Sequence, residues 1–199
     1  MIVATETAAR PSARERLLAA ADELFYAEGV QTVGIDRIIE HAGVAKASLY
    51  NTFGSKEELV RAYLANRRDR STGRISRAIE GVQGPRAKLL AIFDAQAELA
   101  ASPGYRGCAF VAASAEARAG GCVEQATDDY RAWIRALFLD LAEQAGADDP
   151  AALGSQLNLL YDGATLSARM DRDPTAPITA KAAATALLDA AIKPSGRRS

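Results

Sequence analysis

One short segment, residues 45–53, carries side chains suited to contacting nucleic acid. Ammonium, hydroxyl and amide groups recur along it, at Lys46, Ser48, Tyr50, Asn51 and Thr52. A lysine can donate to a phosphate oxygen or a guanine edge, and an asparagine amide can pair with adenine. Ala47 is small enough to let a helix approach the bases and to meet a thymine methyl group. Because the segment also contains no acidic residue, its residue types indicate contact with DNA.

Two helices and a tight turn must position these side chains. Ile35, Ile38 and Ile39 recur at helical spacing, which predicts an apolar face on the first helix. Gly43 can adopt the positive φ that lets a helix stop and the chain turn sharply. The second helix is expected to start near residue 45 and to direct Leu49 inward. A helix–turn–helix of this kind presents its second helix to the major groove of DNA.

The segment from residue 13 to residue 63 resembles the DNA-binding domain of the tetracycline-repressor-type (TetR) family of bacterial transcription regulators. The matching residues are Leu24-Phe25, Glu28-Gly29, Ile38, Ala42-Gly43-Val44, Leu49-Tyr50, Phe53 and Ser55-Lys56-Glu57-Glu58-Leu59. The resemblance implies an all-α fold of about nine helices, with a three-helix helix–turn–helix domain at the N-terminus. We expect this domain over residues 12–54, a linking helix over 55–80, and a C-terminal ligand-binding and dimerisation domain over 85–193.

Residue types and the resemblance together assign the DNA contacts to Thr32, Arg37, Lys46, Ala47, Ser48, Tyr50, Asn51, Thr52 and Lys56. By resemblance, Tyr50 contacts a phosphate, and Lys56 holds another phosphate with the backbone amides that begin the next helix. The alternative for Tyr50 is that it packs on the domain surface. The family usually carries Ser or Thr just before the first helix of the motif, whereas this chain has Gly34, which can cap a helix only through its backbone.

The composition gives little support to catalysis. The chain has 199 residues, a formal net charge of −1 and one histidine, His41. We find no paired-carboxylate motif, metal-ligand cluster or phosphate-binding glycine loop, so neither an enzyme nor a cofactor is expected. Cys108 and Cys122 are either buried thiols or a redox switch.

No apolar run long enough for a transmembrane helix and no signal pattern occur, so we expect a cytoplasmic protein without a membrane partner. Residues 1–11 are expected to form a mobile arm, and residues 193–199 a basic tail.

The second part of the chain begins after Gly81 and the pair Gly84-Pro85. Its last two helices are expected over residues 151–170 and 179–192. Small residues on opposite sides of these helices predict a four-helix interface in a homodimer. The predicted interface residues are Leu157, Leu160, Tyr161, Ala164, Ala168, Ala183, Leu187 and Ala190. The alternative is that alanine occurs there only as a good helix former.

Large side chains among the alanines of this second part predict an apolar pocket for a small molecule. The pocket candidates are Phe93, Gln96, Phe110, Tyr130, Trp133, Ile134 and Tyr161, for which an ordinary core is the alternative. Glu116, Arg118 and Arg169 are candidate charges for an ionic ligand, or surface charges without that role.

The sequence therefore predicts a DNA-binding transcription regulator. We expect a homodimeric repressor that a small-molecule effector of unknown identity releases from a palindromic, double-stranded DNA operator. The alternatives are a helical dimeric ligand-binding protein that binds no operator, and an enzyme built on a helical bundle.

Overall fold

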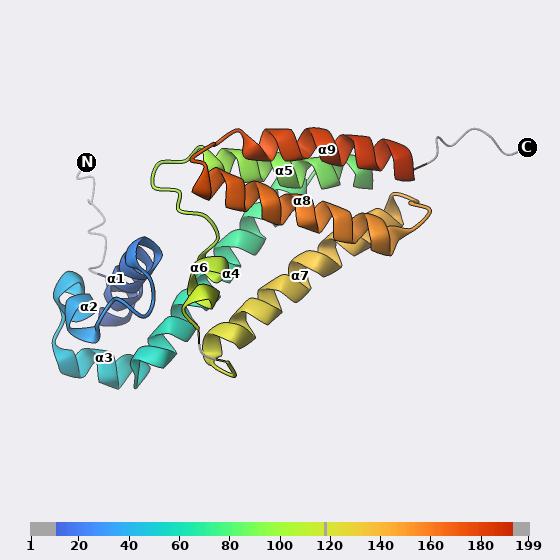
Figure 1. The fold of residues 1–199 in the computed structure, drawn as a ribbon. Coiled ribbons are helices and arrows are strands. Elements are labelled where there is room, and N and C mark those ends of the chain that lie inside the picture. Colours follow the sequence, from blue (N-terminus) through green and yellow to red (C-terminus); the bar gives the residue numbers. More distant parts are fainter. Residues whose placement is uncertain (1–10, 118, 193–199) are drawn as a thin grey trace, which may run out of the picture. The chain divides into compact units, whose positions relative to one another are not determined.

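The computed structural model describes residues 11–117 and 119–192, and every regular element within these ranges is a helix (Figure 1). The nine helices in these ranges are α1 (Ala13–Glu28), α2 (Ile35–Ala42), α3 (Lys46–Phe53), α4 (Lys56–Ile79), α5 (Pro85–Ala100), α6 (Ala109–Ala115), α7 (Cys122–Gln144), α8 (Pro150–Met170) and α9 (Ala176–Ala191). The predicted all-α fold is thus confirmed. Arg118, the predicted tail and all of the predicted arm except Pro11 lie outside the described residues.

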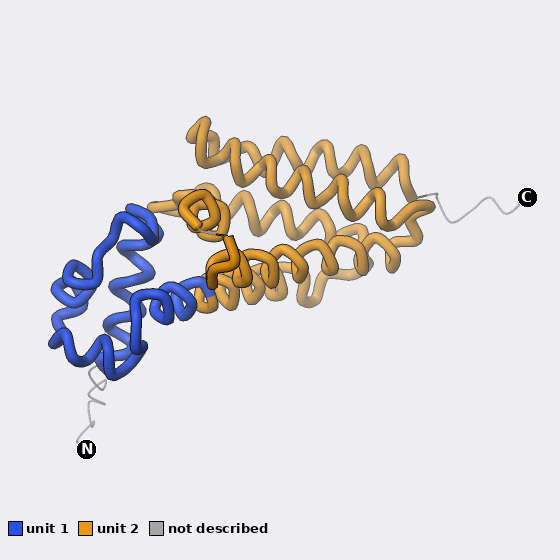
Figure 2. The backbone as a smooth tube through the Cα atoms, turned by 60° about the horizontal axis from the view of Figure 1, so that its bottom comes forward, with its two compact units in different colours: residues 1–64 blue, residues 65–199 orange. Residues whose placement is uncertain are grey.

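The chain divides into two compact units, residues 1–64 (unit 1) and residues 65–199 (unit 2) (Figure 2). Helix α4 runs through the boundary, so residues 56–64 belong to unit 1 and residues 65–79 to unit 2. The helix predicted as a link over residues 55–80 therefore contributes to both units.

Unit 1 is held together by one buried apolar face on each of its first three helices. Leu17 of α1, Ile38 of α2 and Leu49 of α3 are all fully buried, and α1 contacts both α2 and α3. Phe25 of α1 meets Tyr63 of α4 edge to face, with 5.4 Å between the ring centroids. These contacts leave the opposite side of α3 uncovered within the unit.

Side-chain caps begin two helices of unit 1. Ser12 Oγ accepts from Glu15 N at 3.2 Å while Ser12 N donates to Glu15 Oε2 at 2.8 Å, which completes a capping box. Ser12 N and Ser12 Oγ each donate to Glu15 Oε2 at 2.8 Å, and these two hydrogen bonds lower the pKa of Glu15. Ser55 Oγ accepts from Glu58 N at 3.1 Å at the start of α4. Gly34 begins α2 without a side-chain cap, and its carbonyl accepts from the amide that opens the helical ladder.

Unit 2 packs α5, α7, α8 and α9 around one apolar core. Helix α8 contacts α7 and α9, α9 contacts α5, and α6 contacts α7 (Figure 1). Phe93, Phe138 and Leu157 are fully buried in this core. Helices α7 and α8 approach so closely that a Cβ atom on Gly154 would lie 3.2 Å from the backbone of Leu139. Glycine at this position therefore allows the close crossing of the two helices.

The last helix begins earlier than its sequence pattern predicts. Helix α9 starts at Ala176 rather than near residue 179, and Pro177 lies in its first turn. Proline has no N–H, and the first turn of a helix leaves N–H groups without intrahelical acceptors, so Pro177 extends the helix without losing a hydrogen bond.

The residues predicted for the dimer interface differ in how far they are exposed within the single chain. Leu157, Tyr161, Ala164 and Ala168 are at most 7% exposed within the single chain. Leu160 and Leu187 are half-buried and pack against the same core, whereas Ala183 and Ala190 are exposed. Helix α8 is apolar on more than one side, and helical spacing alone does not tell which side faces the chain's own core. The outward side of α8 is formed instead by Leu159, Gly163, Leu166 and Met170.

Candidate functional sites

Helix α3 presents a polar face that unit 1 leaves exposed. Lys46, Ala47, Tyr50 and Asn51 are exposed together, at positions that share one side of the helix. Leu49, on the opposite side, is fully buried, and Tyr50 keeps 45% of its surface exposed. Because the apolar side of α3 packs into the core of the unit, the polar side can meet another molecule without disrupting that core.

The turn before α3 is held by a residue of α1. Gly43 adopts the left-handed conformation at φ 60° and ψ 46°. Arg16 Nη1 donates to Gly43 O at 2.8 Å and to Ala42 O at 3.3 Å. The end of a helix leaves carbonyl groups without intrahelical donors, and the guanidinium supplies donors to them. Arg16 thereby ties α1 to the turn from which α3 starts.

Lys46, the first residue of α3, is paired with Asp36 in the first turn of α2. Lys46 Nζ donates to Asp36 Oδ1 at 2.8 Å, and the two side chains are 60% and 83% exposed. The hydrogen bond and the negative charge of Asp36 raise the pKa of Lys46 above its usual value. The predicted contact residue therefore carries a counter-charge on the same surface.

Arg37 and Thr52 also have partners within unit 1. Arg37 Nη2 donates to Glu28 Oε1 at 2.7 Å, and Arg37 Nη1 forms a second hydrogen bond with the same carboxylate. Thr52 Oγ1 donates to Ser48 O at 2.6 Å within α3, and both residues are half-buried. The hydroxyl proton of Thr52 is therefore engaged by its own helix.

Lys56 and Thr32 lie at the loop between α1 and α2. Lys56 Nζ donates to Gln31 O at 3.4 Å and lies 6.0 Å from the ring centroid of Phe25. Thr32, the next residue of the loop, is exposed. The fold thus brings the start of α4 close to this loop. Lys56 and Thr32, which are both predicted to contact DNA, can therefore belong to one contact surface.

Sequence reasoning did not single out Asp36 or Arg16. Asp36 lies ten residues before Lys46 on another helix, and only the turn brings the two side chains together. The acidic residue is visible at the start of α2, where the helix dipole alone accounts for it. No sequence pattern pairs Arg16 with the carbonyl of Gly43, because the contact depends on how α1 packs.

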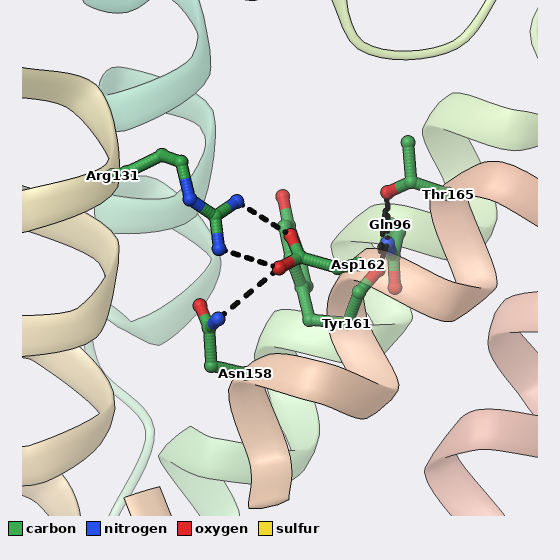
Figure 3. Close-up of polar contacts among 6 residues, drawn as sticks. All are labelled: Gln96, Arg131, Asn158, Tyr161, Asp162 and Thr165. Atoms are coloured by element: carbon green, nitrogen blue, oxygen red, sulfur yellow. Dashed lines mark hydrogen bonds and ion pairs between the residues drawn. The ribbon is translucent and has the colours of Figure 1, made fainter. Parts of the chain in front are cut away.

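A buried polar cluster joins α5 to α8 in unit 2 (Figure 3). Gln96 is 3% exposed, and its Nε2 donates to Tyr161 O and to Thr165 Oγ1, each at 2.7 Å. Thr165 Oγ1 itself donates to Tyr161 O at 3.1 Å, so it acts as an acceptor toward Gln96. This fixes the orientation of the amide and leaves Gln96 Oε1 buried without a donor from the described residues. An unsatisfied buried acceptor costs about 1–3 kcal/mol of stability.

Asn158 leaves a second such oxygen on α8. Its Nδ2 donates to Asp162 Oδ2 at 3.1 Å, and Arg131 of α7 donates to both oxygens of the same carboxylate at 2.8 and 3.2 Å (Figure 3). The hydrogen bonds that Arg131 donates to Asp162 raise the pKa of Arg131. A carboxylate accepts only, so the Asn158 amide must turn its nitrogen toward Asp162. Asn158 Oδ1 is then buried, with no donor in the part of the chain that the structure describes.

The aromatic pocket candidates form two groups in unit 2. Phe93 packs edge to face with Tyr161, with 6.4 Å between the ring centroids. Phe110 of α6 stacks on Tyr130 of α7 at 4.4 Å, and Tyr130 in turn lies 6.4 Å from the ring of Trp133. Every pocket candidate therefore belongs to unit 2, although these ring contacts are also those of an ordinary core.

Each of the two groups contains one buried tyrosine, Tyr161 in the first and Tyr130 in the second. Burial raises the pKa of Tyr130 well above its usual value, and burial also raises the pKa of Tyr161. The positive charge of Arg74 acts against this rise in the pKa of Tyr161 but does not cancel it. Both phenols therefore stay neutral near pH 7. Ile134 lies fully buried in the neighbouring core.

Among the described residues, the cysteines and the metal-ligating residue types form no metal site and no activated thiol. Cys108 and Cys122 are both thiols, and burial raises the pKa of Cys108, which disfavours the reactive thiolate. Across residues 11–117 and 119–192, no three His, Cys, Asp or Glu side chains gather closely enough to hold a metal ion. No helix in the same ranges is both long enough and apolar enough to cross a membrane.

Known transcription regulators resemble this chain in sequence and in structure. A family model described as bacterial regulatory proteins of the tetR family matches residues 17–63. SCO4454, a TetR-family transcriptional regulator from Streptomyces coelicolor, is 32% identical over 91% of this chain and 96% of its own, with a TM-score of 0.86. The TetR-type regulator SAV143 from Streptomyces avermitilis is 34% identical over 91% of this chain and 98% of its own, with a TM-score of 0.79.

Curated relatives match a shorter stretch. The transcriptional activator FasR of Mycolicibacterium smegmatis is 36% identical over 86 residues, which make up 43% of this chain and 39% of FasR. The transcriptional repressor KstR2 of the same organism is 32% identical over 97 residues, 48% of this chain and 47% of KstR2. The chain thus spans less than half the length of either relative.

Proposed function

Because the chain belongs to the TetR family of transcriptional regulators, we propose that it is a homodimeric repressor that a small molecule releases from operator DNA. Helix α3 reads base edges in the major groove, while neighbouring side chains and helix N-termini contact phosphates. The proposal places the protein in the cytoplasm and gives it no catalytic role.

The single observation that carries the DNA-binding proposal is the exposed side of α3. Lys46, Tyr50 and Asn51 share it with Ala47, and α3 contains no acidic residue. A helix of this composition can approach a polyanion and still offer donors to individual bases. The buried Leu49 on the other side anchors the helix during this contact.

Dimer formation is proposed through the outward sides of α8 and α9. Leu159, Leu166 and Met170 of α8 are 70%, 51% and 70% exposed, and Ile178 of α9 is 58% exposed. Gly163 lies on the same stripe of α8, where a Cβ atom would meet nothing within 4 Å. Two copies that bury these stripes against each other form a four-helix interface around a two-fold axis.

A two-fold dimer suits a palindromic operator. Each copy of α3 enters one half-site, and the two half-sites lie about one helical turn apart, roughly 34–36 Å along the duplex. The symmetry of the dimer is then the symmetry of the DNA sequence that it binds.

The effector is proposed to bind in unit 2, near Gln96 and Asn158. Their buried oxygens lack donors among the described residues, so a ligand with hydroxyl or amide N–H groups supplies what they lack. The rings of Tyr130 and Trp133 add apolar surface to the same unit. Such a ligand releases the operator if it binds more tightly to the conformation that does not fit DNA.

The proposal is tested by titrating the purified protein with the DNA upstream of its own gene and following fluorescence anisotropy at two salt concentrations. We expect specific binding that weakens as salt rises, because phosphate contacts release counterions. Lys46→Ala and Tyr50→Ala are expected to fold as the parent does and to bind at least about tenfold more weakly, a loss within the range of single base or phosphate contacts.

Lys181→Ala is the matched control for Lys46→Ala. It removes the same charge from unit 2, where Lys181 pairs with Asp94 at 2.6 Å. If both α3 variants bind like the parent, the assignment of α3 is wrong. If the parent binds all DNA sequences equally or none, the chain is better described as a helical ligand-binding dimer without an operator.

A further inference from the structure

An acidic side chain stands on the surface proposed to meet DNA. Asp36 Oδ1 lies 2.8 Å from Lys46 Nζ, and 83% of the Asp36 side chain is exposed. Phosphates repel a carboxylate, so its position beside the first residue of α3 needs an explanation. The helix dipole explains an acid in the first turn of α2, but it does not explain an ion pair that crosses to α3.

The Lys46–Asp36 pair can still donate hydrogen bonds and can still accept them. A lysine ammonium has three N–H donors, of which Asp36 Oδ1 accepts one. The carboxylate has a second oxygen that can accept a further hydrogen bond. Lys46 and Asp36 together therefore offer donors beside an acceptor, and they carry no net charge between them.

This combination matches one base pair better than the others. In the major groove a G·C pair presents two acceptors, guanine N7 and O6, beside one donor, the cytosine N4 amino group. Lysine is a usual partner of guanine and aspartate a usual partner of cytosine. Resting on the DNA-binding role proposed above, we propose that Lys46 and Asp36 together read one G·C base pair in each half-site, with Asp36 as the acceptor for cytosine N4.

The ion pair also restrains binding to random DNA. While Asp36 neutralises Lys46, the ammonium gains little from approaching a phosphate at an incorrect sequence. At the correct base pair, the cytosine N4 amino group donates to the carboxylate in place of water. Asp36 therefore does not oppose binding at that sequence. Asp36 therefore raises specificity by lowering the affinity for other sequences.

The test is selection of bound duplexes from a pool with a random region of about 30 base pairs, which covers two half-sites one helical turn apart. The full-length parent, Asp36→Ala, Asp36→Asn and Asp94→Ala proteins are compared by sequencing the bound DNA. Asp94→Ala is the matched control, because Asp94 is an exposed acid that pairs with Lys181 in unit 2. Circular dichroism confirms that each variant is folded.

We expect the parent and Asp94→Ala to select the same half-site with a G·C pair at one position. Asp36→Ala loses about tenfold discrimination at that position alone, within the range of a single base contact. Asp36→Asn shifts the preference there toward A·T, because an amide both donates and accepts. Asp36→Ala also binds random duplex more tightly, and its plot of log affinity against log salt steepens by about 0.9, which is one added phosphate contact.

Two outcomes overturn the proposal and are distinguishable. If Asp36→Ala and Asp36→Asn select the parent's sequence with undiminished discrimination at every position, Asp36 reads no base and the proposed DNA-binding function still stands. If the parent enriches no sequence, the DNA-binding function fails, and the role of Asp36 fails with it.

Discussion

Arg16 illustrates how a single contact supports the surface of α3. Its Nη1 donates to the carbonyls of Ala42 and Gly43, the last residues before the chain turns toward α3. Hydrogen bonds from a charged donor contribute about 1.5–3 kcal/mol, more than those between neutral groups. The side chain is half-buried, which limits competition from water. Arg16 therefore acts on the position of α3 without belonging to its exposed side.

Arg16→Met is expected to lower the free energy of unfolding of unit 1 by about 1–3 kcal/mol, because two carbonyls lose their donor while the side-chain stem is kept. Hydrogen exchange of the α2 amides measures this loss in unit 1 separately from unit 2. Arg61→Met is the control, since Arg61 makes an exposed ion pair with Glu58 at 3.3 Å and should lose less than about 1 kcal/mol. Equal protection in the parent and in Arg16→Met would contradict the role given to Arg16.

Single residues differ in how far the sequence could predict them. The outward side of α3 follows from helical spacing once Leu49 is placed in the core, so Lys46, Tyr50 and Asn51 could be predicted. The ion pair between Lys46 and Asp36 could not, because it depends on the angle of the turn. Gln96 of α5 could be predicted as a member of a cluster of large side chains, but the orientation of its amide depends on Thr165 of α8, 69 residues further along the chain.

Helix α8 contains two glycines, Gly154 and Gly163, whose surroundings differ strongly. A Cβ atom on Gly154 would lie 3.2 Å from the backbone of Leu139, which cannot rotate away as a side chain can. A Cβ atom on Gly163 would meet nothing within 4 Å. Substitutions at the two positions therefore separate the effect of packing between α7 and α8 from the effect of helix propensity on stability.

Gly154→Ala is expected to destabilise the protein, since overpacking costs about 1–3 kcal/mol and better helix propensity returns about 1 kcal/mol at most. Gly163→Ala is the matched control. Within one chain its Cβ atom meets no neighbour, so only the better helix propensity of alanine affects stability. Thermal unfolding of dilute samples measures both, with the midpoint lowered by Gly154→Ala and unchanged or raised by Gly163→Ala. A midpoint for Gly154→Ala at or above that of the parent would show that α7 and α8 do not cross so closely.

The helices also show why sequence spacing identified α8 but not its outward side. Alanine and leucine occur on all sides of α8, so several rotations of the helix about its axis would bury an apolar side. The neighbours α7 and α9 decide which phase is buried, and they bury Leu157, Tyr161 and Ala164. The fold class and the approximate bounds of α8 and α9 could be predicted from the sequence, whereas this rotation depends on tertiary contacts.

For the whole molecule, the proposed dimer depends on exposed apolar side chains of α8 and α9. Leu166→Glu places a charge in the centre of the proposed interface, where it would lose water without gaining a partner. We expect the parent to show twice the 21.0 kDa mass of one chain in light scattering at micromolar concentration, and Leu166→Glu to show a single chain.

Val111→Glu is the control for this measurement, because Val111 is a 55% exposed apolar residue of α6, a helix that has no part in the proposed interface. It should remain dimeric. A monomeric parent, or a Leu166→Glu protein that keeps the parent's mass, would contradict the proposed interface.

Guanine N7 methylation interference on the selected operator tests most directly whether α3 enters the major groove, where N7 lies. We expect methylated guanines to block binding in two patches on one face of the duplex, about 10 base pairs apart, as two symmetric copies of α3 require. If the complex forms equally well with every guanine of both half-sites methylated at N7, α3 does not read the major groove.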